Sequence, residues 1–265
     1  MLSLLKRVLV FAAISLSSSP LTAQFQFRSN DGPGDDIIPI ILLGGEWNTV
    51  IVFNNTNDVA VQFPLNFYSE GQPWKVAITG VGTSNTYTIT IPPRGTQRLE
   101  FDYSGDTKVG FANIDVPCGF GPGEYCGGVG TYALLRNHNL ARAQDFEVAY
   151  QLGSTLAPSQ QQFLFDQSDF AQMVLNLTNY CTDSFCRTTI VTVQIFDQNG
   201  QRFYVDTVDI APATVKIVNI AQLSSTTWNK VGMIRLLGVG DIAVTGHRIN
   251  STGSFTPIYS YDYNF

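Results

Sequence analysis

The chain contains few side chains that could perform acid–base or metal chemistry. Its two histidines, His138 and His247, follow two similar segments that each begin Gly-Val-Gly. Depending on where a one-residue gap is placed, either the two histidines align with each other or Arg136 aligns with Arg248. A lone histidine in each copy, without patterned ligands nearby, is more often structural than catalytic or metal-binding. We therefore predict a scaffold role for both histidines.

No familiar catalytic motif is present in the sequence. The chain lacks a Gly-x-Ser-x-Gly elbow, a His-Glu-x-x-His helix and a Gly-x-x-x-x-Gly-Lys loop. Neighbouring acids, such as Asp145 with Glu147 or Asp115 with Glu124, have no spacing that supports a glycosidase pair. We predict no enzymatic activity, no cofactor and no metal. An extracellular hydrolase with a site between two domains is the third hypothesis, because a fold does not determine a function.

Four cysteines fall in two close pairs, Cys118 with Cys126 and Cys181 with Cys186. In an exported chain this spacing predicts two local disulfides, although four cysteines permit three pairings and the sequence leaves the others open. Each bridge would stabilise the fold by roughly 2 to 3 kcal/mol on the chain-entropy model. A zinc site of four cysteines would require spacings nearer Cys-x-x-Cys.

Exposed aromatic rings are the residues most suited to contact a ligand, because they stack on sugar rings and on protein partners. Trp228 lies in a polar run and is the first candidate. Phe120 and Tyr125 lie in the loop that a Cys118–Cys126 bridge would close. Trp74 is a further candidate, with a place in the core as its alternative. The alternative for this loop is a long hairpin tip that the Cys118–Cys126 disulfide only stabilises.

Charge excludes one class of partner. The formal net charge is −6 and only 14% of residues are charged, with no basic cluster. Nucleic acid is therefore a poor partner, because its binding depends on Lys and Arg that neutralise phosphates. The acids near the N-terminus lack the EF-hand pattern of calcium ligands. Asn54, Asn176 and Asn250 fit the glycosylation pattern, which arises readily by chance in a chain rich in Asn and Thr.

The N-terminus reads as an export signal. Lys6 and Arg7 precede an apolar run at 8–16, and Ala23 ends a small-residue cleavage site. We predict a signal peptide at 1–23 and a secreted or cell-surface protein, because the run is shorter than the roughly 20 residues of a membrane span. Residues 24–39 are predicted to form a flexible acidic leader. An alternative is an arm that adds a strand to a neighbouring subunit.

Strand-like alternation fills the remaining chain and occurs in two similar copies. Residues 47–55, 61–67 and 86–91 alternate between apolar and polar types. Phe67-Tyr68 matches Ile195-Phe196, and Val109-Gly110-Phe111 matches Val231-Gly232-Met233. The pattern predicts an all-β protein with two tandem antiparallel immunoglobulin-like β-sandwich domains related by internal duplication. Their predicted bounds are 40–152 and 163–265, joined by a linker at 153–162. Alternatively, the two sandwiches merge into one longer pair of sheets.

Several of these segments carry a resemblance to a known group of proteins. They are Trp47-x-Thr49-x-Ile51-x-Phe53-x-Asn55, Ile91-Pro92-Pro93-Arg94-Gly95 and Val109-Gly110-Phe111-Ala112. The chain resembles uncharacterised secreted bacterial proteins of acidobacterial type, built from tandem β-sandwich repeats. The resemblance implies an envelope location and no catalytic activity.

The expected function is therefore a non-catalytic, exported structural, adhesive or protein-interaction module of the cell surface or extracellular matrix. Its expected partner is a protein or polysaccharide of the envelope or matrix. Self-association through the N-terminal arm is a further hypothesis. The alternative function is a carbohydrate-binding protein that uses exposed aromatics.

Overall fold

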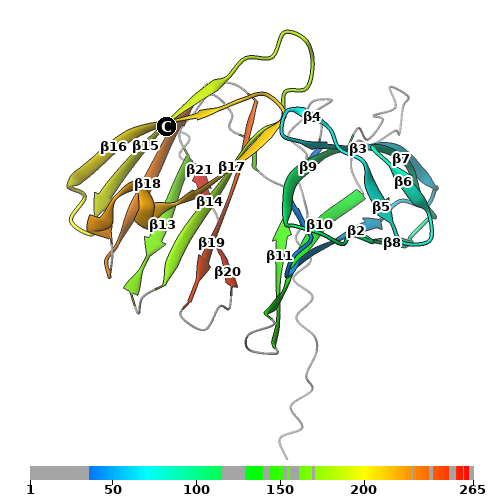
Figure 1. Ribbon diagram of the computed structural model, residues 1–265, viewed down its shortest axis with the longest axis horizontal. Coiled ribbons are helices and arrows are strands. Elements are labelled where there is room, and N and C mark those ends of the chain that lie inside the picture. The colour runs from blue at the N-terminus through cyan, green and yellow to red at the C-terminus, as the bar shows by residue number, and fades with distance from the viewer. Residues whose placement is uncertain are drawn as a thin grey trace, which may run out of the picture.

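A computed structural model describes residues 36–114, 129–139, 144–151, 154–155, 161–168, 171–227, 229–238, 241–250, 255–258 and 260–262. The chain is all-β, as predicted, and its strands form several antiparallel sheets (Figure 1). We call residues 36–151 the first half and residues 154–262 the second half. In the first half the strands are β1 (Asp36–Leu43), β2 (Trp47–Asn55), β3 (Val61–Ser69), β4 (Gln72–Pro73), β5 (Val76–Ile78), β6 (Gly82–Ser84), β7 (Thr86–Ile91), β8 (Thr96–Glu100), β9 (Lys108–Ile114), β10 (Val129–Asn139) and β11 (Gln144–Gln151).

In the second half two short helices, α1 and η2, accompany the strands. The elements are β12 (Ser154–Thr155), β13 (Gln161–Asp166), β14 (Gln172–Asn179), β15 (Thr189–Asp197), β16 (Arg202–Ile210), β17 (Thr214–Asn219), α1 (Ile220–Leu223), η2 (Ser225–Thr227), β18 (Val231–Gly238), β19 (Ile242–Ile249), β20 (Phe255–Ile258) and β21 (Ser260–Asp262). Because α1 is a single turn of four residues, it leaves no helical periodicity in the sequence. The Asn219 side chain caps it by accepting the Ala221 N–H at 3.0 Å.

The two halves have the same strand order. Sheet A has the order β1-β9-β3, with β7 and β4 paired to β3, and sheet B has the order β11-β10-β2-β8. In the second half, sheet E has the order β21-β13-β18-β15-β16 and sheet D the order β12-β19-β14-β17, with β20 also paired to β19. Strands β5 and β6 form a separate small sheet, C. Strand β13 thus corresponds to β1, β15 to β3, and β14 to β2.

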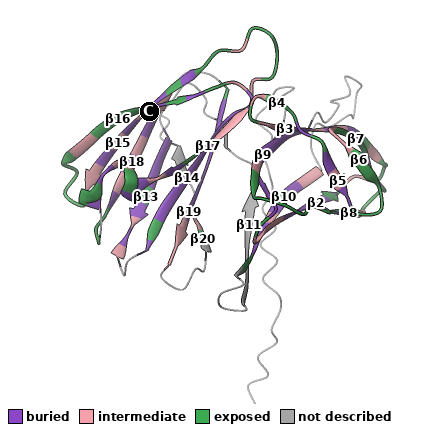
Figure 2. Cartoon of the chain, viewed as in Figure 1, coloured by how far each residue is buried: buried purple, intermediate pink, exposed green. Residues whose placement is uncertain are grey.

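Each half has a core cluster whose side chains come from two sheets. Strand β7 shows the cause, because Tyr87, Ile89 and Ile91 are buried while the threonines between them are exposed. Figure 2 shows buried residues along the strands and exposed residues at the turns. The largest fully buried side chains of the first cluster are Phe53, Phe63 and Phe67. In the second cluster they are Phe163 and Phe165.

Cross-strand registers place the sequence-matched residues in equivalent positions. Tyr68 lies opposite Phe111 in sheet A, and Phe196 lies opposite Met233 in sheet E. The match contains a glycine in each half, Gly110 and Gly232, because a neighbouring strand approaches closely there. A Cβ atom at Gly110 would lie 2.4 Å from the Tyr68 carbonyl oxygen, and one at Gly232 would lie 2.1 Å from that of Phe196. The local match therefore reflects the same close approach of two strands.

The order of strands differs from that of an immunoglobulin domain. In an immunoglobulin constant domain the third, sixth and seventh strands share one sheet. Counting the long strands here, the third and sixth are β3 and β9, which share sheet A with β1. The seventh, β10, pairs with β2 in sheet B instead. The prediction of an all-β chain with antiparallel sheets is confirmed, but the first, fourth and seventh long strands (β1, β7 and β10) do not lie in the sheets that they occupy in an immunoglobulin constant domain.

The predicted leader extends too far into the chain. Residues 36–39 belong to β1, whose Asp36 pairs with Ile114 of β9. Ile37 and Ile38 are each 1% exposed, so the hydrophobic effect holds this segment on its own chain. The apolar part of the proposed intermolecular arm therefore pairs within the molecule. Residues 1–35, with the predicted signal peptide, lie outside the described residues.

The Gly-Val-Gly segments do not occupy equivalent places. Asn55 of β2 lies opposite Val129, and Asn179 of β14 lies opposite Ile242. Counting along the strands from those pairs, the residue equivalent to His247 is Leu134, which lies opposite Val50 as His247 lies opposite Val174. Neither of the two alignments left open by the sequence is correct: His247 is equivalent to Leu134 and Arg248 to Leu135, because the two segments are offset by three residues in the ladder.

The two halves contact each other through the outer faces of sheets A and D. A shared apolar cluster contains Ile37, Phe111 and Tyr68 from sheet A with Ala213, Val215, Tyr180 and Ala243 from or beside sheet D. The Gly71 N–H donates to the Ala213 carbonyl at 3.0 Å, and the Thr178 hydroxyl donates to the Pro39 carbonyl. Sheet E is the layer farthest from the first half (Figure 1).

Candidate functional site

A buried asparagine at the end of β14 organises the turn that follows it. Asn179 is fully buried, and its Nδ2 donates to the Arg187 carbonyl at 3.2 Å, to the Ile210 carbonyl at 3.1 Å and to Thr189 Oγ1 at 3.3 Å. Its Oδ1 accepts the Cys181 N–H at 3.2 Å. One side chain thereby satisfies both ends of the turn.

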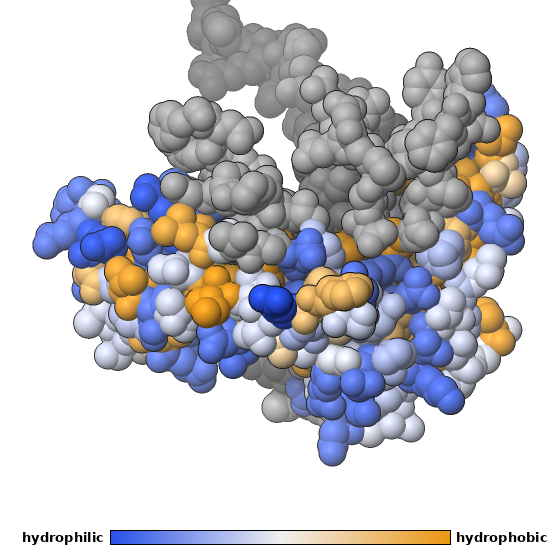
Figure 3. Space-filling model, turned by 90° about the horizontal axis from the view of Figure 1, so that it is seen from above, coloured by the Kyte–Doolittle hydropathy of each residue, from blue (hydrophilic) through white to orange (hydrophobic). Residues whose placement is uncertain are grey.

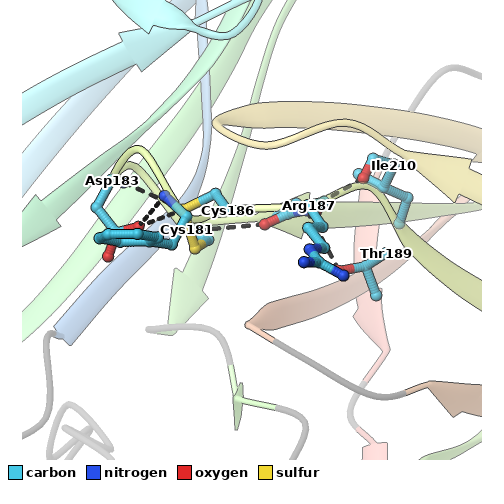
Figure 4. Close-up of a disulfide and its surroundings, with 8 residues drawn as sticks. Cys181, Asp183, Cys186, Arg187, Thr189 and Ile210 are labelled. Carbon is cyan, nitrogen blue, oxygen red and sulfur yellow. Dashed lines mark hydrogen bonds between the residues drawn. A yellow bond between two sulfur atoms is a disulfide. The ribbon is translucent and has the colours of Figure 1, made fainter.

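Cys181 and Cys186 form a disulfide across this turn, as predicted (Figure 4). Their Cα atoms lie 5.6 Å apart. Inside the loop, the Asp183 carboxylate accepts the Phe185 N–H at 3.0 Å, and the Asp183 carbonyl accepts the Cys186 N–H at 3.3 Å. The bridge, the Asp183 contacts and the Asn179 contacts together hold the loop in one conformation.

This loop presents an aromatic ring that the sequence predictions missed. The side chain of Phe185 is 88% exposed, more than any other large hydrophobic residue described. The apolar ring of a phenylalanine so exposed is in contact with water, and burial of that ring against a partner would be favourable. The available signal was its place between two closely spaced cysteines. We define the candidate site as the Cys181–Cys186 loop with Phe185 at its tip.

The loop is not a metal site. Cys181, Asp183 and Cys186 bring their ligand atoms within 4.8 Å of one another. Both sulfur atoms are joined in the disulfide, whereas a metal ligand would have to be a thiolate. One exposed carboxylate remains, which is insufficient for a cation site.

The candidate site is tied to the contact between the halves. The Ala213 N–H donates to the Cys181 carbonyl at 3.0 Å, and the Ala213 carbonyl accepts the Gly71 N–H from the first half. In the first half the corresponding turn has no cysteine. There Arg94 takes the place of Ala213, and its N–H donates to the Asn57 carbonyl at 3.0 Å. The disulfide is therefore a feature added to a shared turn.

Trp74 is not a ligand contact. It is 7% exposed and belongs to the first core cluster, where its ring lies against Gly110. Trp74 therefore takes the alternative place considered for it, in the core, where the absence of a Cβ atom at Gly110 leaves space for the indole. Trp228, Phe120 and Tyr125 lie outside the described residues, as do Cys118 and Cys126.

The two histidines have different environments. His138 is exposed near the end of β10, whereas His247 is 6% exposed on the outer face of sheet D. Burial lowers the pKa of His247 to about 4, so its ring is neutral near pH 7. Asn176 Nδ2 lies 3.1 Å from Thr245 Oγ1 and 3.5 Å from His247 Nδ1. Because Asn176 is fully buried, its glycosylation pattern is inaccessible in the folded chain.

Arg248 has a structural role near the end of β19 in the same sheet. Its Nε donates to the Asp166 carbonyl at 2.9 Å, and its guanidinium also donates to the Ser168 carbonyl at 3.1 Å. The Ser168 hydroxyl donates to the Asp166 carboxylate and holds the pKa of that group below its usual value. These contacts fix the turn between β13 and β14 rather than forming a reactive site.

No family model, curated protein or solved structure matches this chain. In the part of the chain that the structure describes, no helix is long and apolar enough to cross a membrane.

Proposed function

We propose that the chain is a non-catalytic, exported structural or adhesive module that contacts a partner of the cell surface or extracellular matrix through the Cys181–Cys186 loop. The observation that carries the proposal is the 88% exposure of Phe185 on a loop closed by a disulfide. A recognition loop that is already ordered loses less conformational entropy when it binds. The disulfide is consistent with an oxidising, extracytoplasmic location, and the signal-like N-terminus supports the same location.

The shared strand order and registers support a second part of the proposal. Val61 lies opposite Ile91 in sheet A, and Thr189 lies opposite Ile210 in sheet E. We propose that the two halves are β-sandwiches that arose by internal duplication, with the first, fourth and seventh strands in the opposite sheets relative to an immunoglobulin constant domain. On this proposal the chain belongs with the secreted acidobacterial-type repeat proteins that it resembles, and function lies where the copies differ.

Binding to envelope and matrix material tests the loop directly. Mature protein beginning at Gln24 is incubated with envelope fractions and, separately, with insoluble polysaccharides. Phe185→Ala is compared with Val81→Ala, which removes a side chain that is 65% exposed on a turn of the first half. Retention that falls with Phe185→Ala and persists with Val81→Ala supports the proposal, and the retaining material identifies a protein or a polysaccharide partner. Equal retention of both variants would reject the loop as the contact.

A further inference from the structure

The outer face of sheet E carries an exposed apolar surface that the loop proposal does not use. Its members lie on the four strands β13, β18, β15 and β16 and point away from the second core. Leu164 is 57% exposed, Ile190 57%, Val205 49% and Val231 48%. Met233, Phe196 and Leu237 are half-buried beside them. We call this set the sheet E face.

Cross-strand pairing joins three members of the face, whereas Val205 lies opposite Gln194 and Ile190 lies opposite Asp209. Leu164 lies opposite Met233, which lies opposite Phe196, so these three side chains form a row across three strands. The Arg235 guanidinium lies 5.1 Å from the centre of the Phe196 ring, a cation–π contact, and Asp166 and Asp209 add two further charges to this side of the sheet. Figure 3 shows hydrophobic residues among polar ones on the part of the surface that belongs to the second half.

The first half provides a matched comparison. By register, Gln62 of sheet A is the equivalent of Ile190, and Thr86 is the equivalent of Val205. The sheet A residues are exposed and polar. Gln62 donates to Thr90 Oγ1 at 3.2 Å, and the Thr86 hydroxyl donates to Asn66 Oδ1 at 2.9 Å. The scaffold therefore does not require apolar residues at these positions, and sheet E has acquired them.

The packing on the outer face of sheet A suggests what could pack on the outer face of sheet E. In sheet A the Tyr68 and Phe111 rings stack with centroids 5.4 Å apart and lie against sheet D, which belongs to the other half of the same chain. Their equivalents in sheet E are Phe196 and Met233, which belong to none of the four apolar clusters of the described chain; of the two, Phe196 has the Arg235 guanidinium over its ring. An outer sheet face of this scaffold thus packs against another sheet of the same scaffold. We propose that the sheet E face binds the sheet E face of a second copy of this chain, about a two-fold axis.

Two observations favour this closed arrangement over a head-to-tail one. In a head-to-tail contact, sheet E of one copy would pack on the first half of the next copy, in the way that sheet A packs on sheet D within the chain. There the position of Ala213 is occupied by Arg94, whose guanidinium pairs with Asp58 at 2.8 Å in the exposed turn. Seating that ion pair on apolar residues would desolvate it. A two-fold contact, by contrast, places the exposed apolar residues of one sheet E face, such as Leu164 at 57% exposure, against the same residues of the second copy.

The size of the face is compatible with a stable dimer. Four strands about 4.8 Å apart and about eight residues long cover roughly 500 Å². This area is of the same order as the roughly 800 Å² per partner of a standard interface.

The test measures the mass of the mature chain in solution over a concentration series, by light scattering and sedimentation equilibrium. The triple variant Leu164→Gln, Ile190→Gln, Val205→Thr introduces at two positions the residues that sheet A carries. The control is Val59→Thr with Val81→Thr, which changes two residues of the first half that are 66% and 65% exposed. All variants alter exposed positions, and unfolding curves verify that each remains folded.

We expect two chains for the wild type and the control, and a dissociation constant raised by roughly tenfold or more in the triple variant. A wild type that stays at one chain at every concentration overturns the proposal. So does a triple variant that dimerises as the wild type does, or a mass that keeps growing beyond two chains. A dimer that is lost on deletion of residues 24–35 but retained in the triple variant would assign association to the N-terminal arm instead.

Discussion

Asn55 and Asn179 hold equivalent turns in the two halves with equivalent hydrogen bonds. Asn55 Nδ2 donates to the Val59, Ile91 and Pro92 carbonyls at 2.8, 3.3 and 3.0 Å, and its Oδ1 accepts the Asn57 N–H at 2.9 Å. Asn179 makes the corresponding contacts to Arg187, Ile210 and Cys181. Each asparagine is 1% exposed or less.

The first prediction concerns these asparagines. Asn179→Ala leaves buried carbonyls and an N–H without partners and is expected to destabilise the fold by roughly 2 to 4 kcal/mol. Asn55→Ala should have a similar effect, because its contacts are the same. Urea unfolding measures both. Asn54→Ala is the control, since Asn54 is the exposed neighbour in the same strand. If either variant loses less free energy of unfolding than the control, the turns do not depend on the asparagine side chains.

The second prediction concerns Gly232. Gly232→Ala places a Cβ atom 2.1 Å from the Phe196 carbonyl and 2.6 Å from the Phe165 ring, so β15 and β18 must separate. We expect a loss of roughly 2 to 3 kcal/mol, as for other overpacked cores. Gly130→Ala is the control, because its nearest neighbour lies 4.0 Å away. Thermal unfolding should separate the two variants clearly, and equal melting temperatures would contradict the close approach.

The third prediction concerns His247 and pH. The pKa of its ring is about 4 in the folded chain against 6.5 for an ordinary histidine, so the unfolded chain takes up the proton first as the pH falls. The stability that His247 contributes is fully present above pH 6.5 and is lost as the pH falls from 6.5 to 4. The loss approaches about 3 kcal/mol.

Urea midpoints at several pH values between 7.5 and 4 measure this dependence. His247→Leu introduces the residue that the first half has at this place, and it should flatten the curve over that window. His138→Leu, at an exposed position, should leave the curve as in the wild type. If His247→Leu unfolds with an unchanged pH dependence, another group is responsible for it.

The fourth prediction concerns the contact between the halves. Ala213 has a φ of 52°, as Arg94 does, so an arginine is compatible with the backbone at this position. Ala213→Arg would bring a charge into the apolar cluster beside Ile37 and Phe111, which is unfavourable without a partner. We expect the halves to lose their contact and to unfold in two separate calorimetric transitions. Arg94→Ala, on the exposed turn, should change neither their number nor their temperatures. A single transition in Ala213→Arg would show that other contacts hold the halves together.

The fifth prediction concerns the disulfide. Cys181→Ser with Cys186→Ser removes a constraint on the unfolded chain worth roughly 2 kcal/mol for so short a loop. Asn179 should still hold the base of the turn, so the fold is expected to remain intact. Limited proteolysis should then cut near Phe185 in the variant and not in the wild type. Cleavage of both at the same rate would mean that the bridge does not order the loop.

The sequence by itself determined the strand content and the local matches between the two halves. Alternation of apolar and polar residues is a property of neighbouring residues, and in β7 it gives the observed burial directly. The pairing of Cys181 with Cys186 and the match of Gly110 with Gly232 are also local. Each depends on a few neighbouring residues, so a short window of sequence contains the information.

Only the tertiary structure decided which strands are neighbours and which surfaces remain exposed. The Gly-Val-Gly match suggested that His138 and His247 are equivalent, but ladder register depends on pairing with β2 and β14, which lie far away in sequence. Trp74 is buried because of Gly110, and Ile37 is buried because of β9 and the second half. Phe185 and the sheet E face stay exposed for the same reason. Burial depends on what the rest of the chain brings to a residue, and one strand's pattern does not contain that information.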